Sequence, residues 1–454
     1  MGGEMIEKQL ACGRQWSATQ FSSVMNNYSL PQIKQRPAFQ KIDQQLVCQR
    51  CHQVVSEQTC LPDGRYYCAA CLMFGRLVEG DQLVYIPEEN QFATVEQPLT
   101  WSGTLTAFQA QAAEKIVTVV TNKQQHVLTA VTGAGKTEML FSGIATALAR
   151  GQRVCVAAPR VAVCLELYPR LQTAFAKTPS MLMYGTQTAP YMYTPLVVCT
   201  THQLFKFYHA FDTVIVDEVD AFPYVNNPLL ATAVKQACKP HCALIYLTAT
   251  PTAKLRHAIN IGQLTESELP IRFHGHLLPE PHCRPIFRWR QTIKRHKLPR
   301  VLQALIQDCL KTQRLLLFVP QVHDLEQVRR SIVKTLPKVA VATVHASDPD
   351  QLAKIAAFRS GTGDILITTT VLERGVTLKN VAVFVLGAEH IVFNEAVLVQ
   401  IAGRAGRDKA YAANLVYFFY TDYTLAIKRA CQQIKYQNQK GRRLQSTVRS
   451  VQRP

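Results

Sequence analysis

Short runs of apolar residues recur along most of the chain, and segments of helical length separate them. One run covers residues 127–131 and is followed by a loop that contains Gly133 and Gly135. A helical pattern then extends over 136–149, and Gly151 ends it. Strands that alternate with helices in this way predict a parallel α/β sheet, because each helix must cross over to the next strand.

A second series of the same kind follows after residue 290. Its apolar strands lie in the segments RLLLFVP, KVAVATVH, GDILITTT and VAVFVLG, which helical segments separate. The chain has 454 residues, of which 48% are hydrophobic, so it can bury two or three separate cores. We therefore predict an α/β fold with two parallel-sheet lobes in tandem.

Four cysteines near the N-terminus form two C-x-x-C pairs. The pairs are Cys48/Cys51 and Cys68/Cys71. Two residues between cysteines let one tight turn aim both sulfurs at a single ion, and two such turns complete a closed tetrahedral zinc site. We predict a structural zinc ribbon over 41–80, with Asp63 and Gly64 at the turn of a hairpin. A pair of redox dithiols is the alternative.

Charge and hydropathy limit the class of protein. Lys and Arg number 50 against 31 Asp and Glu, a formal net charge of +19, which favours a nucleic acid or an anionic membrane surface as partner. No apolar run approaches the roughly 20 residues that cross a bilayer, and the first residues lack the apolar core of a secretion signal. We expect a cytoplasmic protein with no transmembrane segment, whose remaining cysteines are reduced.

The segment AVTGAGKTE, between the first strand and its helix, has the features of a phosphate-binding loop. Glycines let backbone amides turn toward phosphate oxygens, and the helix N-terminus adds partial positive charge. Lys136 would reach the outer phosphates of ATP, and Thr137 would ligate Mg²⁺. The residues predicted to hold the nucleotide here are Thr132, Gly133, Ala134, Gly135, Lys136, Thr137 and Glu138.

Three carboxylates follow another apolar run, in the segment TVIVDEVDAFPY. An acidic turn after a strand is often a solvated loop or a helix cap. A phosphate loop, however, needs an Asp at the carboxyl end of a second strand to hold Mg²⁺, and Asp217 has that position. Glu218 would orient and deprotonate the attacking water. Asp220 would either cap the following turn or couple ATP hydrolysis to the rest of the protein.

Gln400, Arg404 and Arg407 lie in the segment VQIAGRAGRDK, with the spacing of one face at the start of a helix. Two arginines three positions apart can be a solvated surface. Beside a phosphate loop, however, they are suited to stabilise charge on the γ-phosphate across a cleft. The predicted catalytic residues are Lys136, Asp217, Glu218, Gln400, Arg404 and Arg407.

The ordered segments GTLTAFQ, AVTGAGKTE, APRVAVCLEL, TTHQL, DEVD, LTAT, TTTVLERGVTL and QIAGRAGR resemble a superfamily 2 helicase motor, which has two RecA-like lobes. The resemblance covers both series of strands. It implies lobe 1 over 95–285 and lobe 2 over 290–425. An N-terminal extension over 1–40, the zinc module over 41–80 and a basic tail over 426–454 complete the expected domain organisation.

The same resemblance implies roles for individual residues. Gln109 would recognise adenine, while Thr248 and Thr250 would couple hydrolysis to lobe movement. Positions expected at the lobe interface are Arg374, Gly375 and Thr377, with Gly375 close to the nucleotide. Positions expected to face the nucleic-acid backbone are Arg160, Thr200, Thr201 and Thr369.

The four cysteines before the motor, with the segments WSGTLT, DEVDAFPY and FHGHLLPEP, closely resemble the ComFA family of late competence proteins. That resemblance implies an ATPase that drives single-stranded DNA into the cytoplasm during transformation. It also implies placement at the inner face of the membrane, beside a DNA channel, and a phosphoribosyltransferase-like competence partner. Polarity, duplex unwinding and assembly into a homo-oligomer stay open.

Three other protein classes share some of these features. The primosomal helicase PriA has the same type of motor and carries zinc, but its cysteine clusters lie within the second lobe. A DEAD-box RNA helicase would have alanine where this chain has Val219. A nucleotide-gated DNA clamp that does not move could dispense with Glu218, Arg404 and Arg407, all of which are present.

Two further segments leave alternatives open. The C-terminal segment carries only basic charges; such tails are usually solvated, and a contact with DNA or anionic lipid is the alternative. We expect Tyr436 to pack against the second lobe rather than to stack on a base. His274 and His276 lack the paired spacing of a zinc site, so we expect a linking segment there that contacts DNA or protein.

Overall fold

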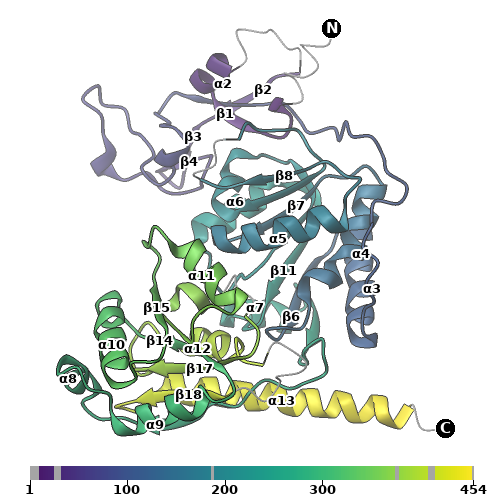
Figure 1. The fold of residues 1–454 in the computed structure, drawn as a ribbon. Helices are drawn as coiled ribbons and strands as arrows, with labels where there is room; N and C mark the ends of the chain where they lie inside the picture. The colour runs from purple at the N-terminus through teal and green to yellow at the C-terminus, as the bar shows by residue number, and fades with distance from the viewer. Residues whose placement is uncertain (1–9, 25–31, 186–188, 374–377, 407–414, 452–454) are drawn as a thin grey trace. The chain divides into compact units, whose positions relative to one another are not determined.

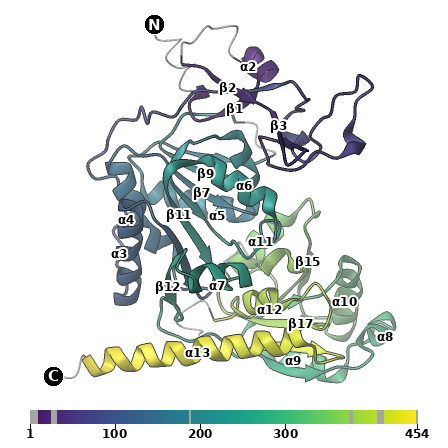
Figure 2. The same cartoon turned by 180° about the vertical axis from the view of Figure 1, so that it is seen from behind.

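The computed structural model describes residues 10–24, 32–185, 189–373, 378–406 and 415–451 (Figures 1 and 2). The chain divides into two compact units. The first comprises Met1–Leu128 and Thr137–Ser267, and the second comprises Thr129–Lys136 and Glu268–Pro454. The phosphate loop therefore belongs to the second unit, although the strand and helix on either side of it lie largely in the first.

A seven-stranded sheet forms the centre of the first unit, in the order β12-β6-β11-β10-β7-β9-β8. β10 pairs in parallel with β11 and β7, and β9 pairs in parallel with β7 and β8. The strands are β6 (Gln125–Ala130), β7 (Val154–Ala158), β8 (Ser180–Met183), β9 (Leu196–Thr200), β10 (Phe211–Val216), β11 (Cys238–Thr248) and β12 (Thr265–Leu269). The predicted parallel sheet is confirmed. β6 begins before Val127 because backbone pairing continues beyond the apolar run.

Helices connect and flank these strands (Figures 1 and 2). They are α3 (Ala107–Thr121), α4 (Lys136–Ala149), α5 (Val161–Ala174), the 3₁₀ helix η3 (Thr201–Lys206), α6 (Pro228–Ala237) and α7 (Ala253–Asn260). α4 has the predicted bounds. α3 begins at a capping box in which the Thr106 side chain accepts from the Gln109 backbone N–H and the Gln109 side chain accepts in return. Such a cap provides hydrogen-bond acceptors for two backbone N–H groups that have no partner within the helix.

The second unit contains a six-stranded sheet in the order β13-β18-β17-β14-β16-β15, and every neighbouring pair is parallel. The strands are β13 (His282–Pro285), β14 (Arg314–Phe318), β15 (Val341–Val344), β16 (Ile365–Thr368), β17 (Val381–Leu386) and β18 (Val416–Tyr420). The second predicted parallel sheet is thus confirmed. β13 was not predicted, because its four residues show no apolar pattern.

Six α-helices and one 3₁₀ helix accompany this sheet in the described part of the second unit. They are α8 (Trp289–Lys294), α9 (Arg300–Cys309), α10 (Val322–Thr335), α11 (Gln351–Ser360), η4 (Thr370–Glu373), α12 (Glu395–Ala402) and α13 (Leu425–Val451). Within the residues described, none of the helices in the chain combines the length and the hydropathy needed to cross a bilayer.

The N-terminal part of the first unit folds around a small antiparallel sheet. Its central strand, β5 (Gln82–Tyr85), pairs with β1 (Gln15–Ser17) on one side and β2 (Lys34–Pro37) on the other. The hairpin of β3 (Phe39–Ile42) and β4 (Gln45–Cys48) leads into the cysteine segment. The remaining short helices are α2 (Ala18–Val24), η1 (Glu57–Thr59) and η2 (Leu72–Phe74). Segments before and after the cysteines are therefore parts of one sheet.

This N-terminal part shares a hydrophobic core with the seven-stranded sheet. The side chain of Gln15 donates to the Phe205 carbonyl at 3.0 Å, and the rings of Phe74 and Phe205 lie 5.2 Å apart. The side chain of Gln236, on α6, donates to the Gln49 carbonyl at 2.8 Å. The cysteine segment is thus packed onto η3 and α6 and does not stand as a separate body.

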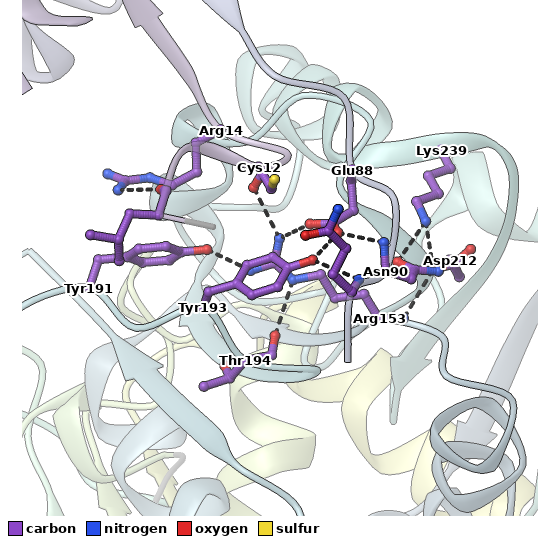
Figure 3. Close-up of polar contacts among 12 residues, drawn as sticks. Cys12, Arg14, Glu88, Asn90, Arg153, Tyr191, Tyr193, Thr194, Asp212 and Lys239 are labelled. Carbon is purple, nitrogen blue, oxygen red and sulfur yellow. Dashed lines mark hydrogen bonds and ion pairs between the residues drawn. The ribbon is translucent and has the colours of Figure 1, made fainter. Parts of the chain in front are cut away.

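A buried polar network also fixes the segment after β5 to the sheet (Figure 3). The Arg153 guanidinium is 2.7 Å from the Glu88 carboxylate, and both side chains are fully buried. Arg153 also donates to the Tyr191 hydroxyl at 2.6 Å, and its backbone N–H donates to Asp212 at 3.0 Å. Lys239 completes the network with a 2.9 Å ion pair to Asp212. A buried charge pair of this kind is stable only while both partners are present.

Candidate active site and metal centre

The phosphate loop joins β6 to α4 through two glycines with left-handed backbone. Gly133 has φ +83° and Gly135 has φ +78°, values that residues with a side chain rarely adopt. The Ala134 N–H donates to the Val131 carbonyl at 3.1 Å, which tightens the turn. The Lys136 ammonium donates to the Ala130 carbonyl at 2.9 Å. The ammonium therefore stays close to the loop where phosphates would bind.

Arg272, which the sequence did not single out, holds this loop within the second unit. Its side chain is 1% exposed, and it approaches to 3.7 Å the position that a Cβ on Gly133 would take. The next N–H, of Phe273, donates to the Gly133 carbonyl at 3.0 Å. The guanidinium donates to the carbonyls of Gly403 and Gly406, and burial lowers its pKa to about 10. Arg272 thus links the loop to the QIAGRAGR segment.

Gln400 lies against the same loop. The Thr132 hydroxyl donates to the Gln400 side-chain oxygen at 3.1 Å. A Cβ on Gly403 would come within 2.7 Å of Thr132, so only glycine fits there. The expectation of a helix start at this segment is wrong: α12 ends at Ala402, which places Gln400 in its last turn and Arg404 beyond it.

Arg404, the first of the two predicted arginines, is 3% exposed. Its guanidinium donates through two nitrogens to the Glu373 carbonyl, at 2.8 and 2.6 Å. Its contact with a γ-phosphate stays a prediction. Arg407 and Gly375 lie outside the described residues, as do Arg374 and Thr377.

Asp217 follows the last residue of β10, so its predicted place at the carboxyl end of a sheet strand is confirmed. It is 8% exposed, and its carboxylate accepts from the Glu218 N–H at 2.8 Å. Glu218 has φ +53°, a left-handed conformation that is uncommon for residues other than glycine, although ten other such residues in the described part of the chain share it. Their roles in binding Mg²⁺ and in activating water stay predictions.

The carboxylate of Asp220 joins the ends of two neighbouring strands. One oxygen accepts from the Thr248 hydroxyl at 2.9 Å, and the other accepts from the Thr250 hydroxyl at 2.5 Å. All three side chains are buried. Of the two alternatives for Asp220, these bonds favour the link to another segment, because they tie the DEVD turn to the LTAT turn.

Three other residues predicted to bind the nucleotide are Gln109, Thr137 and Glu138. Gln109 is 5% exposed, and its side-chain oxygen accepts from the Thr106 N–H at 2.9 Å. Thr137 is buried in the first turn of α4, and the neighbouring Glu138 forms an ion pair with Arg170 of α5. Adenine recognition by Gln109 and Mg²⁺ ligation by Thr137 stay predictions.

The residues expected at the nucleic-acid backbone differ in exposure. Arg160 is half-buried, and its Nε donates to the carbonyl of Phe222, whose side chain is 75% exposed. Thr200 and Thr201 are buried as whole residues, at 5% and 0% exposure, and their contact with a nucleic-acid strand stays a prediction. Thr369 is half-buried and directly follows β16. Phe222 was not predicted, because an aromatic residue in an apolar stretch suggests core.

The four predicted metal ligands form a closed cluster. They are Cys48, Cys51, Cys68 and Cys71, all buried, with their Sγ atoms within 4.8 Å of one another. The Cys51–Cys68 and Cys68–Cys71 sulfurs are 3.5 Å apart, and the Cys48–Cys71 sulfurs are 3.7 Å apart. A tetrahedral ion with Zn–S bonds of about 2.3 Å requires sulfurs about 3.8 Å apart, whereas a disulfide requires about 2.05 Å. The donor set and the spacing therefore fit zinc.

Arg50 lies within the first cysteine pair and completes this centre. It is 2% exposed, and its Nε and Nη2 lie 3.3 and 3.2 Å from the Cys71 sulfur. Nη2 also donates to the Cys71 carbonyl at 2.7 Å. Zinc with four thiolates would carry net negative charge, so a buried guanidinium at a ligand sulfur would stabilise the site once it is loaded. Arg50 was not predicted, because C-x-x-C spacing identifies only the residues that can ligate the metal.

The predicted hairpin turn between the cysteine pairs is also confirmed. The Leu61 N–H donates to the Arg65 carbonyl at 2.7 Å, and Gly64 has φ +82°. The Arg65 guanidinium forms an exposed 2.7 Å ion pair with Asp63. The turn brings the second pair of cysteines back toward the first.

Comparison with known proteins agrees with these motifs. A family model described as DEAD/DEAH box helicase matches residues 106–258, and one described as helicase conserved C-terminal domain matches residues 296–409. Competence protein ComFA of Streptococcus pneumoniae is 40% identical over 406 residues, which cover 89% of this chain and 93% of the relative. Competence protein ComFA of Bacillus subtilis is 41% identical over 384 residues, which cover 84% of this chain and 82% of the relative.

The two-lobed fold also matches a solved helicase. Dbp5 of S. cerevisiae, in a structure bound to RNA and ADP BeF3, aligns with a TM-score of 0.55 at 15% identity. The alignment covers 73% of this chain and 91% of that one. Similarity at this level concerns the fold alone, and it confirms the predicted RecA-like lobes.

Proposed function

This chain belongs to the ComFA family of competence proteins, and from that premise we propose that it is a motor that uses ATP to pull single-stranded DNA into the cell during transformation. Its helicase domains make it a competence-related superfamily 2 helicase-like ATPase. Movement along DNA, stimulation by DNA and the role in uptake are the parts proposed here.

The observation that carries the proposal is the bonding of Asp220 to Thr248 and Thr250. Asp220 lies two residues after Glu218, the proposed catalytic base. A motor must convert a change at the γ-phosphate into displacement of another segment, and two hydroxyls bound to one buried carboxylate supply such a connection. A clamp that does not hydrolyse ATP could keep this connection but would not need Glu218, which precedes it in the same turn.

ATP hydrolysis would use the residues assembled above. The loop amides and Lys136 would bind the phosphates, and Glu218 would accept a proton from the attacking water. Arg404 and Arg407 would stabilise charge that develops on the γ-phosphate. Mg²⁺, which this ATPase family uses with ATP, would neutralise phosphate charge when it is held by Thr137 and Asp217.

The DNA strand would run along both lobes, and the protein would bind its sugar-phosphate backbone. Arg160, Thr200 and Thr201 would contact phosphates on lobe 1, and Thr369 would do so on lobe 2. The zinc centre supports this arrangement indirectly, because its segment packs on η3, which begins at Thr201. The metal would be structural: it would keep η3 in place and take no part in hydrolysis.

Family membership also supports the partners and the location proposed. The protein would act at the inner face of the cell membrane, beside the channel that delivers transforming DNA. A phosphoribosyltransferase-like competence protein would be a second partner. The net charge of +19 is consistent with attraction of a polyanion to such a site.

The test is steady-state ATPase activity at fixed ionic strength with single-stranded DNA, duplex DNA or RNA, because affinity for a phosphate backbone depends steeply on salt. We expect strong stimulation by single-stranded DNA and much less by the other two. Lys136→Ala should abolish turnover while the fold and the zinc content remain.

Other results would point elsewhere. Equal stimulation by RNA would favour an RNA helicase, and unwinding of forked duplexes without a preference for free single strands would favour a PriA-like role. If the zinc-loaded protein hydrolyses ATP equally fast in the presence and in the absence of nucleic acid, the result would favour the nucleotide-gated DNA clamp.

A further inference from the structure

The long helix α13 has one buried face and one exposed face (yellow in Figure 1). It spans 27 residues and contains no acidic residue. The buried positions are Ile427, Ala430, Ile434, Gln437, Asn438 and Gly441. Asn438 exchanges two 2.9 Å hydrogen bonds with the backbone of Leu278, which fixes the rotation of the helix about its axis. The opposite face is therefore held toward solvent.

Five cations lie on that exposed face. They are Lys428, Arg429, Lys435, Arg442 and Arg443, and we call them, together with Tyr436, the basic face. Steps of seven residues make nearly two helical turns, so Lys428, Lys435 and Arg442 form one row. Arg429, Tyr436 and Arg443 form a second row beside it. From first to last the rows extend about 22 Å at 1.5 Å per residue.

Two acidic residues, Glu268 and Glu280, lie beside the basic face. Among the ion pairs of the described residues, Arg442 has a long contact of 3.6 Å with Glu280, and neither side chain is buried. Lys440, at the edge of the face, pairs with Glu268. Like charges in rows repel one another, so a ligand with regularly spaced negative charges would be favoured.

Tyr436 gives the basic face a second chemical character. Contrary to the expectation that it packs on the second lobe, its side chain is 51% exposed. The Lys440 ammonium lies 4.7 Å from the ring centroid, which orients the ring beside the cations. An exposed ring among cations is the arrangement that binds single-stranded nucleic acid, whose bases are free to stack.

We propose that the basic face of α13 binds single-stranded DNA, through phosphate contacts from its five cations and base stacking on Tyr436, as a second contact outside the helicase motifs. The inference rests on the proposed function, which supplies the strand. A membrane surface is less suitable as partner. Surface helices bind bilayers by burying an apolar face, and the apolar face of α13 is already packed against the protein.

The first test removes the charge without altering the helix. Lys428→Gln, Arg429→Gln and Lys435→Gln are combined, since glutamine has similar helix propensity, and binding of fluorescent oligo(dT) is followed by anisotropy across salt concentrations. Each lost phosphate contact lowers the salt slope by about 0.7, so the triple variant should lose about 2 units of slope and bind ~10- to 100-fold more weakly near 0.1 M salt.

A second variant separates stacking from charge. Tyr436→Ala should weaken oligo(dT) binding about fivefold or more, because a stacked base contributes appreciably to affinity, while the salt slope stays that of the wild type. A merely structural role for Tyr436 would instead lower the melting temperature. Tyr436→Phe, which keeps the ring, should restore most of the affinity.

The matched control removes three exposed cations elsewhere in the second unit: Lys311→Gln, Lys334→Gln and Lys338→Gln combined. It should bind oligo(dT) almost as the wild type does. The proposal is overturned if both triple variants weaken binding equally, since net charge alone would then explain the loss. It is also overturned if the α13 triple variant keeps wild-type affinity.

Two further results are informative about the partner and the premise. If the α13 triple variant no longer binds vesicles with anionic lipid but keeps its affinity for oligo(dT), the basic face binds a membrane and not DNA. That result would overturn the proposal. If single-stranded DNA stimulates the ATPase of the wild type but the α13 variants bind it normally, only this inference fails. If the wild type neither binds oligo(dT) nor is stimulated by it, the proposed function fails as well.

Discussion

At the scale of single residues, two buried arginines give the candidate sites features that motifs do not describe. Arg50 bonds to a cysteine sulfur, and Arg272 joins the phosphate loop to the carbonyls of Gly403 and Gly406. Both are long cationic side chains that hydropathy patterns assign to the surface. Their importance comes from partners distant in sequence, which no local pattern contains.

Arg50→Ala should weaken zinc binding. It removes the guanidinium that stabilises the thiolates of the loaded centre, and losing an outer-shell partner typically lowers metal affinity about 10- to 100-fold. Zinc transfer to a colorimetric chelator measures the effect. Arg65→Ala, an exposed arginine of the same segment, is the control and should release zinc at the wild-type rate. Equal release from all three proteins would remove Arg50 from the centre.

Glu218→Gln should bind ATP but hydrolyse it slowly. Glutamine keeps the size of the side chain and cannot accept the proton, so we expect a loss of about 10²- to 10⁴-fold in the hydrolysis rate. Single-turnover hydrolysis, with nucleotide affinity measured in parallel, separates the chemical step from binding. Hydrolysis at the normal rate would show that another group serves as the base.

His126 should make the first unit sensitive to acid. It is fully buried in β6, its Nδ1 is 2.7 Å from the Thr265 hydroxyl, and burial lowers its pKa to about 4. Its pKa in the unfolded chain is 6.5, so the unfolded state binds more protons between the two values and stability falls as pH falls through that window. At pH 5 the loss should be about 2 kcal/mol relative to neutral pH.

Denaturant unfolding at pH 7 and pH 5 measures this loss. His126→Gln should show a smaller difference between the two pH values than the wild type. His241→Gln, which alters an exposed histidine, should behave as the wild type does. An unchanged pH dependence in His126→Gln would assign the acid sensitivity to other groups.

At the scale of elements, the link between β10 and β11 connects the catalytic turn to its neighbour. Thr250→Val removes one hydroxyl from Asp220 and leaves a buried carboxylate oxygen without that donor. We expect ATP binding to persist while DNA-stimulated turnover falls by about tenfold or more, since a buried charge-assisted bond contributes about 1.5–3 kcal/mol.

Thr250→Ser is the control for that prediction, because it keeps the hydroxyl and should retain most of the stimulation. The measurement is ATPase rate against single-stranded DNA concentration. A Thr250→Val protein with full stimulation would show that the bond to Asp220 has no part in coupling.

The elements themselves were largely predictable from hydropathy. The helix over 136–149 has the expected bounds because a glycine loop precedes it and Gly151 follows it. The segment around Gln400 was placed at a helix start, although Gly403 in fact ends α12 there. β13 and β1 could not be predicted, because strands of three or four mixed residues are defined by pairing partners alone.

At the scale of the whole molecule, the main difference from expectation concerns the cysteine segment. The sequence indicated a small module before the motor, but the segment shares a core with the seven-stranded sheet. Its contacts with η3 and α6 join residues almost two hundred positions apart, such as Gln49 and Gln236. Spacing of cysteines predicts a metal site and says nothing about the surface on which it rests.

Arg153→Ala should therefore destabilise the first unit strongly. It leaves the Glu88 carboxylate buried without its partner, and breaking a buried ion pair on one side typically costs about 3–5 kcal/mol. Thermal and denaturant unfolding of zinc-loaded protein measure the change. Lys239→Ala, in the more exposed part of the same network, should cost less. If both variants lose the same free energy of unfolding, the Arg153–Glu88 pair contributes no more than Lys239 does to fixing the segment after β5 to the sheet.

The small sheet of β1, β5 and β2 has a practical consequence. Both partners of β5 come from residues before position 41, the segment that the sequence placed outside the zinc module and the two lobes. A shortened chain that starts there would keep all four cysteines of the metal cluster yet leave the backbone of β5 unpaired along two edges, and bare strand edges promote aggregation. Precipitation of such a truncated protein would then result from intermolecular pairing of the exposed β5 edges and not from a failure to bind zinc.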